Sequence, residues 1–142
     1  MPLPSTGASQ GYRATSLRQK GWDMSQKVNK LRAGGDVHGL IEIAVNERCR
    51  KGERRDAIDA LGEMRAREAV GPLIPLLQRE GIMVHAANAL GAIGDGRAAP
   101  YLVHLMKDRS KMVRMYGELN INLLYKADPD GVRAALDNAL GR

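Results

Sequence analysis

Apolar positions recur at helical spacing along most of the chain, stop at a short polar break, and then recur. In the segment from Asp56 to Leu77 one stripe precedes the break and another follows it: Ala57, Ile58, Leu61 and Met64, then Leu73, Ile74, Leu76 and Leu77. Apolar residues at i, i+1, i+4 and i+7 are typical of an amphipathic helix with one buried face. The pattern therefore predicts a helical hairpin.

This hairpin is repeated. The segment that starts at Asp56 aligns without a gap to the one that starts at His85, at an offset of 29 residues. The matched pairs are Ala57 with Ala86, Ala60 with Ala89, Leu61 with Leu90, Gly62 with Gly91, Met64 with Ile93, Ala69 with Ala98, Leu73 with Leu102 and Leu76 with Leu105. One hairpin alone cannot bury stripes this wide on both of its helices, so neighbouring hairpins must stack.

Weaker copies flank the two central ones and complete four predicted pairs. The predicted helices are 22–33 with 37–49, 54–65 with 68–79, 82–93 with 97–107, and 110–126 with 129–140. Asp36, Asp95 and Asp128 precede helices as N-caps, and Pro129 suits a first helical turn. In the last pair, the first helix takes its apolar pattern from Val113, Tyr116, Leu119 and Leu123.

Two prolines interrupt the second helix of the second pair. Pro72 and Pro75 stand where the next copy has Tyr101 and His104. An interior proline removes a backbone hydrogen bond and clashes with the preceding turn. If this helix effectively begins near Pro72, both prolines fall in its first turn and most of this cost disappears.

The motif Ala-x-x-Ala-Leu-Gly-x-Ile-Gly-Asp-x-x-Ala-x-x-x-Leu at 86–102 resembles the HEAT-like repeat of the short-period class, found in phycobilisome lyase relatives and many bacterial scaffold proteins. The resemblance implies an all-α fold, an α-α superhelix or α-solenoid of about four HEAT-like hairpins. It further implies that first helices lie on the convex side and second helices line the concave side. In the last pair Asn120 replaces Gly91 and Asn122 replaces Ile93, which fits a solvent-facing cap.

Composition limits the protein class. The single cysteine excludes an internal disulfide, and no run of apolar residues approaches the length of a membrane span, so we expect a cytoplasmic protein. Residues 1–55 hold 11 Lys and Arg against 5 Asp and Glu, which accounts for the whole net charge of +6. We expect a flexible basic arm over 1–20, which could meet a polyanion, and a HEAT-like repeat domain over 21–142.

No catalytic or metal site emerges from the sequence. None of the three histidines, His38, His85 and His104, lies at ligand spacing from another histidine or from Cys49. Basic neighbours should lower the pKa of Cys49. Because no partner base can be named, we nevertheless expect Cys49 to be an inert thiol. We interpret the row of carboxylates Asp56, Asp59 and Glu63 as the solvent-exposed face of a helix. We expect the glycines at 91–96 to allow close helix packing and a tight turn.

We therefore expect a protein that is not an enzyme and has no cofactor. An enzyme or lyase subunit is suggested only by the family resemblance, because fold analogy carries no chemistry of its own.

Two surfaces are candidates for binding. The first is a concave row on the second helices, with an aromatic residue, cations and hydrogen-bonding groups typical of protein recognition: Arg97, Tyr101, His104, Asp108 and, from the preceding pair, Arg79. The second is a basic ridge on equivalent inter-repeat turns: Arg48, Arg50, Lys51, Arg54, Arg55, Lys107, Arg109, Lys111 and Arg114. Interspersed acids, and the lack of aromatic residues in the ridge, leave solvated turns as an alternative.

The leading hypothesis is a scaffold or adaptor that binds another protein on the concave row. The alternative is a nucleic-acid-binding α-solenoid that uses the basic ridge and the amino-terminal arm. Tyr101 could instead cover the next hairpin.

Overall fold

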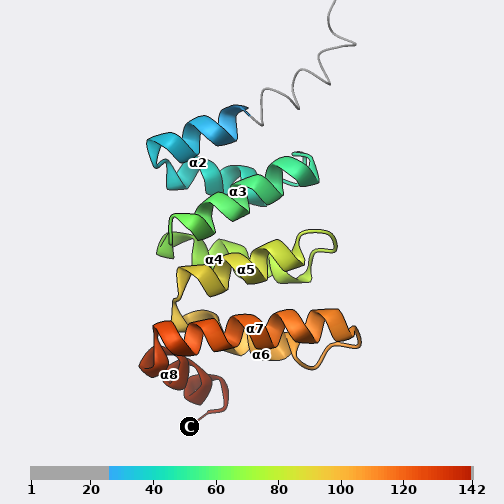
Figure 1. Cartoon of the computed structure of the whole chain (residues 1–142), viewed down its shortest axis with the longest axis vertical. Helices are drawn as coiled ribbons and strands as arrows, with labels where there is room; N and C mark the ends of the chain where they lie inside the picture. The colour runs from blue at the N-terminus through green and yellow to red at the C-terminus, as the bar shows by residue number, and fades with distance from the viewer. Residues whose placement is uncertain (1–25, 142) are drawn as a thin grey trace, which may run out of the picture.

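The computed structural model describes residues 26–141, and every regular element among them is helical, with no strand in this range. Helical hairpins follow one another along the vertical axis of Figure 1, and the chain ends at the bottom of the stack. The predicted all-α solenoid of about four hairpins is confirmed. The predicted arm over 1–20 lies outside the described residues.

The four pairs occur in the predicted order. Residues 26–34 form a helix that pairs with α2 (Val37–Val45). The second pair joins α3 (Lys51–Glu63) to a segment made of η1 (Arg67–Ala69), α4 (Val70–Leu73) and η2 (Ile74–Gln78). The third joins α5 (Met83–Ile93) to η3 (Gly96–Ala98) and α6 (Ala99–Leu105), and the fourth joins α7 (Lys111–Ala127) to α8 (Pro129–Ala139). No helix between residues 26 and 141 combines the length and apolar character that crossing a bilayer requires.

The boundary between α2 and α3 differs from the prediction. The helix predicted to reach 49 ends at Val45, and the helix predicted to begin at 54 begins at Lys51. Asn46 has an extended backbone, and its side-chain oxygen accepts a hydrogen bond from the Arg48 N–H at 2.9 Å. This asparagine turn ends the helix earlier than the apolar pattern suggests.

The second helix of the second pair does not begin at Pro72. An α-helical turn already starts at Val70, after the 3-10 turn of η1, and the chain returns to 3-10 geometry at Ile74. Pro75 lies in the first turn of η2. Because Pro75 has no N–H to continue the α-helical ladder, the change of helix type accommodates it.

The buried core contains the apolar residues that match between the two copies of the 29-residue repeat. Leu61 and Leu90, the equivalent leucines of the two central copies, are both fully buried, as are Leu73 and Leu102. The first helices α3, α5 and α7 contact one another in turn, while the second helices form the other layer. Leu40 and Ile43 extend this core into the first pair.

The predicted caps are confirmed. Asp36 accepts a hydrogen bond from the Gly39 N–H, Asp95 from the Arg97 N–H and Asp128 from the Gly131 N–H, at 2.9, 3.0 and 3.0 Å. After α5, Gly94 has a φ of 76°, a left-handed conformation that glycine adopts without strain. These signals fix where α5 ends and where α8 begins.

The face of α7 that packs inward is only partly the predicted one, because Val113 packs against the core but two of the predicted leucines do not. Leu119 and Leu123 are 51% and 43% exposed, whereas Gly117, Asn120 and Leu124 are buried. Asn120 is therefore no solvent-facing cap residue. Its amide nitrogen donates hydrogen bonds to the side-chain oxygen of Asn88 and to the carbonyl of Tyr116, both at 2.9 Å.

Candidate protein-binding groove

The second helices α6 and α8 lie side by side and border an open groove of about 820 Å³. One wall comes from η3, α6 and the preceding η2, and the other from α8. The wall residues are Gln78, Arg97, Pro100, Tyr101 and His104 on the first side, and Gly131, Ala134, Ala135, Asn138 and Ala139 on the second.

The groove brings together three of the five residues predicted for the concave row. Arg97, Tyr101 and His104 all line it, and Tyr101 is 48% exposed. The apolar residues Ala98, Leu102 and Leu105, on the opposite face of this segment, are buried as predicted. Tyr101 therefore lies beside the neighbouring hairpin, and about half of its surface is exposed to solvent.

The other two predicted residues are engaged outside the groove. The Asp108 carboxylate accepts a hydrogen bond from the Ser110 N–H at 2.9 Å, in the turn that leads into α7. Arg79 forms an ion pair with Glu47 at 2.7 Å, between consecutive turns. Neither side chain lines the groove. Each residue lies past the end of its helix, where helical spacing no longer predicts the direction of a side chain.

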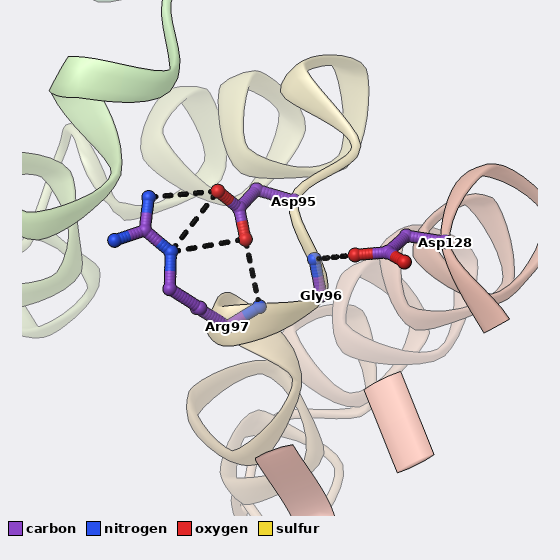
Figure 2. Close-up of polar contacts among 4 residues, drawn as sticks. All are labelled: Asp95, Gly96, Arg97 and Asp128. Atoms are coloured by element: carbon purple, nitrogen blue, oxygen red, sulfur yellow. Dashed lines mark hydrogen bonds and ion pairs between the residues drawn. The ribbon is translucent and has the colours of Figure 1, made fainter. Parts of the chain in front are cut away.

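Arg97 is held by Asp95 (Figure 2). Its Nε lies 3.1 and 3.0 Å from the two Asp95 carboxylate oxygens, and its Nη2 lies 2.7 Å from Oδ2. The hydrogen bonds from Arg97 hold the pKa of Asp95 below its usual range, against the opposing effect of burial. The same bonds raise the pKa of Arg97, so both groups remain charged.

Asp128 fixes α8 against the third pair. In Figure 2 its side chain reaches from the start of α8 to the backbone of Gly96; Oδ2 accepts that N–H at 3.0 Å while Oδ1 accepts the Gly131 N–H at 3.0 Å. A Cβ on Gly96 would meet the backbone of Gly131 and Val132. The sequence predicts Asp128 as a cap but does not predict this second contact, of which the glycine at position 96 is the one sign.

The chemistry of the groove suits a protein ligand. Its α8 wall consists mostly of glycine and alanine, which allow close approach of another chain. Tyr101, His104, Gln78 and Asn138 supply hydrogen-bonding groups around this apolar surface, and among the described residues no acidic side chain lines the groove. An apolar surface with a few polar groups at its border, including Tyr and Arg, is typical of protein recognition sites.

The basic ridge is assembled only in part. The turns that enter α3, α5 and α7 follow one another along the right-hand edge of Figure 1, as predicted. Arg54, however, is 6% exposed, and its Nε donates to the Ala44 carbonyl at 3.0 Å. Arg54 therefore joins α2 to α3, and it is wrong to count it as a surface cation. Arg54 lies within α3, on the side of the helix that faces α2, where the Ala44 carbonyl accepts its hydrogen bond.

Two more ridge cations also bind the backbone. The Arg55 Nε donates to the Gly81 carbonyl at 2.8 Å. An Arg114 nitrogen donates to the Asp108 and Arg109 carbonyls at 2.8 and 3.0 Å. The exposed remainder of the ridge includes Arg48, Lys51, Lys107, Arg109 and Lys111.

The expected direction of the pKa shift of Cys49 is wrong, whereas the interpretation of Cys49 as an inert thiol stands. Burial raises the pKa of Cys49, with a further contribution from the Glu53 carboxylate, and Arg54 and Lys27 offset this only in part. The basic neighbours in sequence thus do not produce a reactive thiolate. Within residues 26–141 no group of three or more His, Cys, Asp or Glu side chains is arranged to hold a metal ion.

The carboxylate row of α3 is used structurally. The Asp59 carboxylate lies 2.9 Å from Nδ1 of His85 on α5, and Glu63 lies 3.6 Å from Nε of Arg32. These contacts link neighbouring repeats.

A comparison with protein families finds a match to the family described as HEAT repeats over residues 37–122, which is more than half of the chain. The matched range includes the two central hairpins and most of α7. No curated protein matches the chain significantly.

Proposed function

Because the chain belongs to the HEAT repeat family, we propose that it is a non-enzymatic cytoplasmic adaptor that binds another protein in the groove between α6 and α8. The observation that carries the proposal is the convergence of Arg97, Tyr101 and His104 on one groove with an alanine-rich wall. The closer likeness to the repeats of phycobilisome lyase relatives rests on the motif at 86–102 and belongs to the same proposal.

Each residue has a role in this proposal. Tyr101 supplies a half-exposed aromatic ring that a partner side chain can cover, and aromatic residues are frequent energetic anchors of interfaces. Asp95 occupies only some of the five N–H donors of the Arg97 guanidinium and fixes its position. Such preorganisation lowers the entropy cost of binding a partner carbonyl or carboxylate.

The test is a pull-down from the native host, with the captured partner identified by mass spectrometry and then titrated calorimetrically. The double change Tyr101→Ala with Arg97→Ala should weaken binding by at least about 2 kcal/mol. The control is Tyr125→Ala with Arg133→Ala, because Tyr125 is 49% exposed, much like Tyr101, and neither residue lines the groove. Equal affinity of the two double variants would contradict the proposal.

Nucleic-acid binding is the second candidate function, supported by the exposed cations on adjacent turns. Replacing Arg48, Lys51, Arg109 and Lys111 with glutamate should abolish binding to single- or double-stranded nucleic acid, and the affinity of the unchanged protein should fall steeply with salt. The groove variants should leave that binding unaffected. A salt-independent affinity for the pull-down partner would favour the groove.

A further inference from the structure

The outer face of α7 carries an apolar surface that the described residues, 26–141, leave exposed. Met112, Met115, Leu119 and Leu123 are 61%, 56%, 51% and 43% exposed, and we refer to them as the α7 stripe. Their spacing of three, four and four residues confines them to about 80° of the helix surface, at about 100° per residue. The core contacts of α7 come from other positions, including Gly117 and Leu124.

The α7 stripe is not a general property of first helices in this protein. The exposed positions of α3 include Asp56 and Glu63, and those of α5 are Asn88 and Ala92. Four large apolar side chains in a row, on a layer whose first helices otherwise expose polar or small residues, are typical of an interaction site. Methionine is common on such surfaces because its unbranched side chain adapts to different partners.

Charges at the ends of the stripe define the partner. Lys107, Arg109 and Lys111 lie at its amino-terminal end, where the only acid among them, Asp108, accepts a hydrogen bond from the Ser110 N–H. Lys126 lies at its carboxyl-terminal end, and Glu118 lies beside its middle. A second copy of this chain, with its α7 docked in parallel or antiparallel orientation, would bring cations against cations. Like charges placed together oppose association.

An anionic membrane also fits the stripe poorly. Helices that lie in a bilayer interface bury a broad apolar face, often with Trp or Phe. The α7 stripe is narrow, contains no aromatic residue, and has Glu118 next to it. A narrow stripe at helical spacing fits the single apolar face of another helix.

We propose that the α7 stripe docks an amphipathic helix of a partner protein whose apolar residues are flanked by Asp and Glu. The apolar side chains of that helix cover Met115 and Leu119 at the centre, and its carboxylates lie near the lysines at the two ends. This surface is separate from the groove between α6 and α8, so the protein can engage two partners at once.

A designed peptide provides the probe: a helical peptide of about five turns with leucines at i, i+3, i+7 and i+11 and glutamates on both sides of them. A second peptide carries lysines in place of the glutamates. Fluorescence anisotropy should show binding of the glutamate peptide and at least about tenfold weaker binding of the lysine peptide. Met115→Ser with Leu119→Ser should weaken glutamate-peptide binding at least about tenfold, with an unchanged circular dichroism spectrum.

Two further variants complete the test. Lys111→Glu with Lys126→Glu keeps the stripe intact and should reverse the preference between the two peptides. Tyr101→Ala, in the groove, should leave peptide binding unchanged, which separates this proposal from the groove proposal.

Several results would overturn the proposal. They are failure of the glutamate peptide to bind, equal binding by the serine variant, and an unchanged peptide preference after the two lysine changes. Binding to phosphatidylcholine–phosphatidylserine vesicles that the serine variant loses, without peptide binding, would indicate a membrane surface. Concentration-dependent dimerisation in sedimentation velocity that the same variant abolishes would indicate a second copy.

Discussion

At the scale of single residues, aspartates at helix starts organise this protein. Asp95 caps η3, fixes Arg97 and is itself nearly buried, and Asp128 satisfies backbone donors of two different pairs. The sequence position of each aspartate predicts its capping role, whereas its tertiary contact follows from the stack. Changes at these carboxylates should therefore affect both helix ends and the packing of repeats.

Replacing Asp95 with alanine should lower the free energy of unfolding by about 1 to 2 kcal/mol, because the cap and the bonds from Arg97 are lost. The ion pair with Arg97 should contribute little to this loss of stability, because the Arg97 side chain is largely exposed to solvent. Since the pKa of Asp95 is lower in the folded than in the unfolded chain, its stabilising effect is complete above the unfolded pKa of about 4. The effect disappears as the pH falls through the lower folded pKa.

Urea titrations of both proteins at neutral pH and at successively lower pH measure this effect. The difference in stability between wild type and Asp95→Ala should shrink in acid. A difference that stays constant down to pH values where carboxylates are fully protonated would contradict the assigned cause.

The second residue-scale prediction concerns Cys49. Because burial raises its pKa, less thiolate is present at neutral pH than in an exposed cysteine, and the thiolate is the reactive form. Iodoacetamide should therefore alkylate the native protein more slowly than the urea-unfolded chain at the same pH. Faster reaction of the native protein would mean that the basic neighbours dominate after all.

At the scale of elements, close contact between first helices depends on glycine. A Cβ added at Gly62 would lie 2.9 Å from the Ala89 Cα, and one added at Gly91 would meet the Asn120 side chain. These glycines occupy the same position in the two central copies, as the repeat predicts. Gly62 allows the backbones of α3 and α5 to approach closely, and Gly91 leaves room on α5 for the Asn120 side chain of α7.

Gly91→Ala should lower the free energy of unfolding by about 1 to 3 kcal/mol, because the added methyl group overpacks the α5–α7 contact. The control is Gly52→Ala in α3, where a Cβ meets nothing within 4 Å, so the change should be neutral or stabilising. In an Asn120→Ala background, Gly91→Ala should cost less, because most of the clashing atoms are absent. Thermal unfolding of the single and double variants tests this, and equal costs in both backgrounds would show that the contact is misassigned.

At the scale of the whole molecule, stability is distributed along a stack in which each hairpin covers its neighbours. Leu61 and Leu90 lie fully buried at equivalent positions of adjacent hairpins (Figure 1 shows α3 and α5 side by side). Within residues 26–141, the α7–α8 hairpin packs against the third hairpin alone. We therefore expect the central hairpins to be the most sensitive to lost volume.

Leu61→Ala and Leu90→Ala should each lower the free energy of unfolding by about 2 to 5 kcal/mol, through lost burial and the cavity that remains. Leu140→Ala serves as the control, because Leu140 is 65% exposed and its loss should cost less than about 0.5 kcal/mol. Guanidinium titrations give all three values. A cost near zero at Leu61 or Leu90 would contradict the assignment of the core.

The sequence by itself determined the helical periods, the 29-residue repeat, the aspartate caps and thus the solenoid. These features are local or repeat at fixed spacing, so each can be recognised without the fold. The same spacing brought Arg97, Tyr101 and His104 onto one side of a helix, and the structure adds the α8 wall that makes a groove beside them.

Only the tertiary structure decided which face of α7 is buried and which cations are exposed. Helix α7 has two apolar faces, and periodicity cannot rank them. Gly117 lies so near α6 that a Cβ added there would meet the Leu102 carbonyl, and this packing, with burial of Leu124 and Asn120, leaves Leu119 in solvent. Arg54 is buried because the Ala44 carbonyl at the end of α2 accepts its hydrogen bond. Both outcomes depend on partners from other elements, which a one-dimensional pattern does not contain.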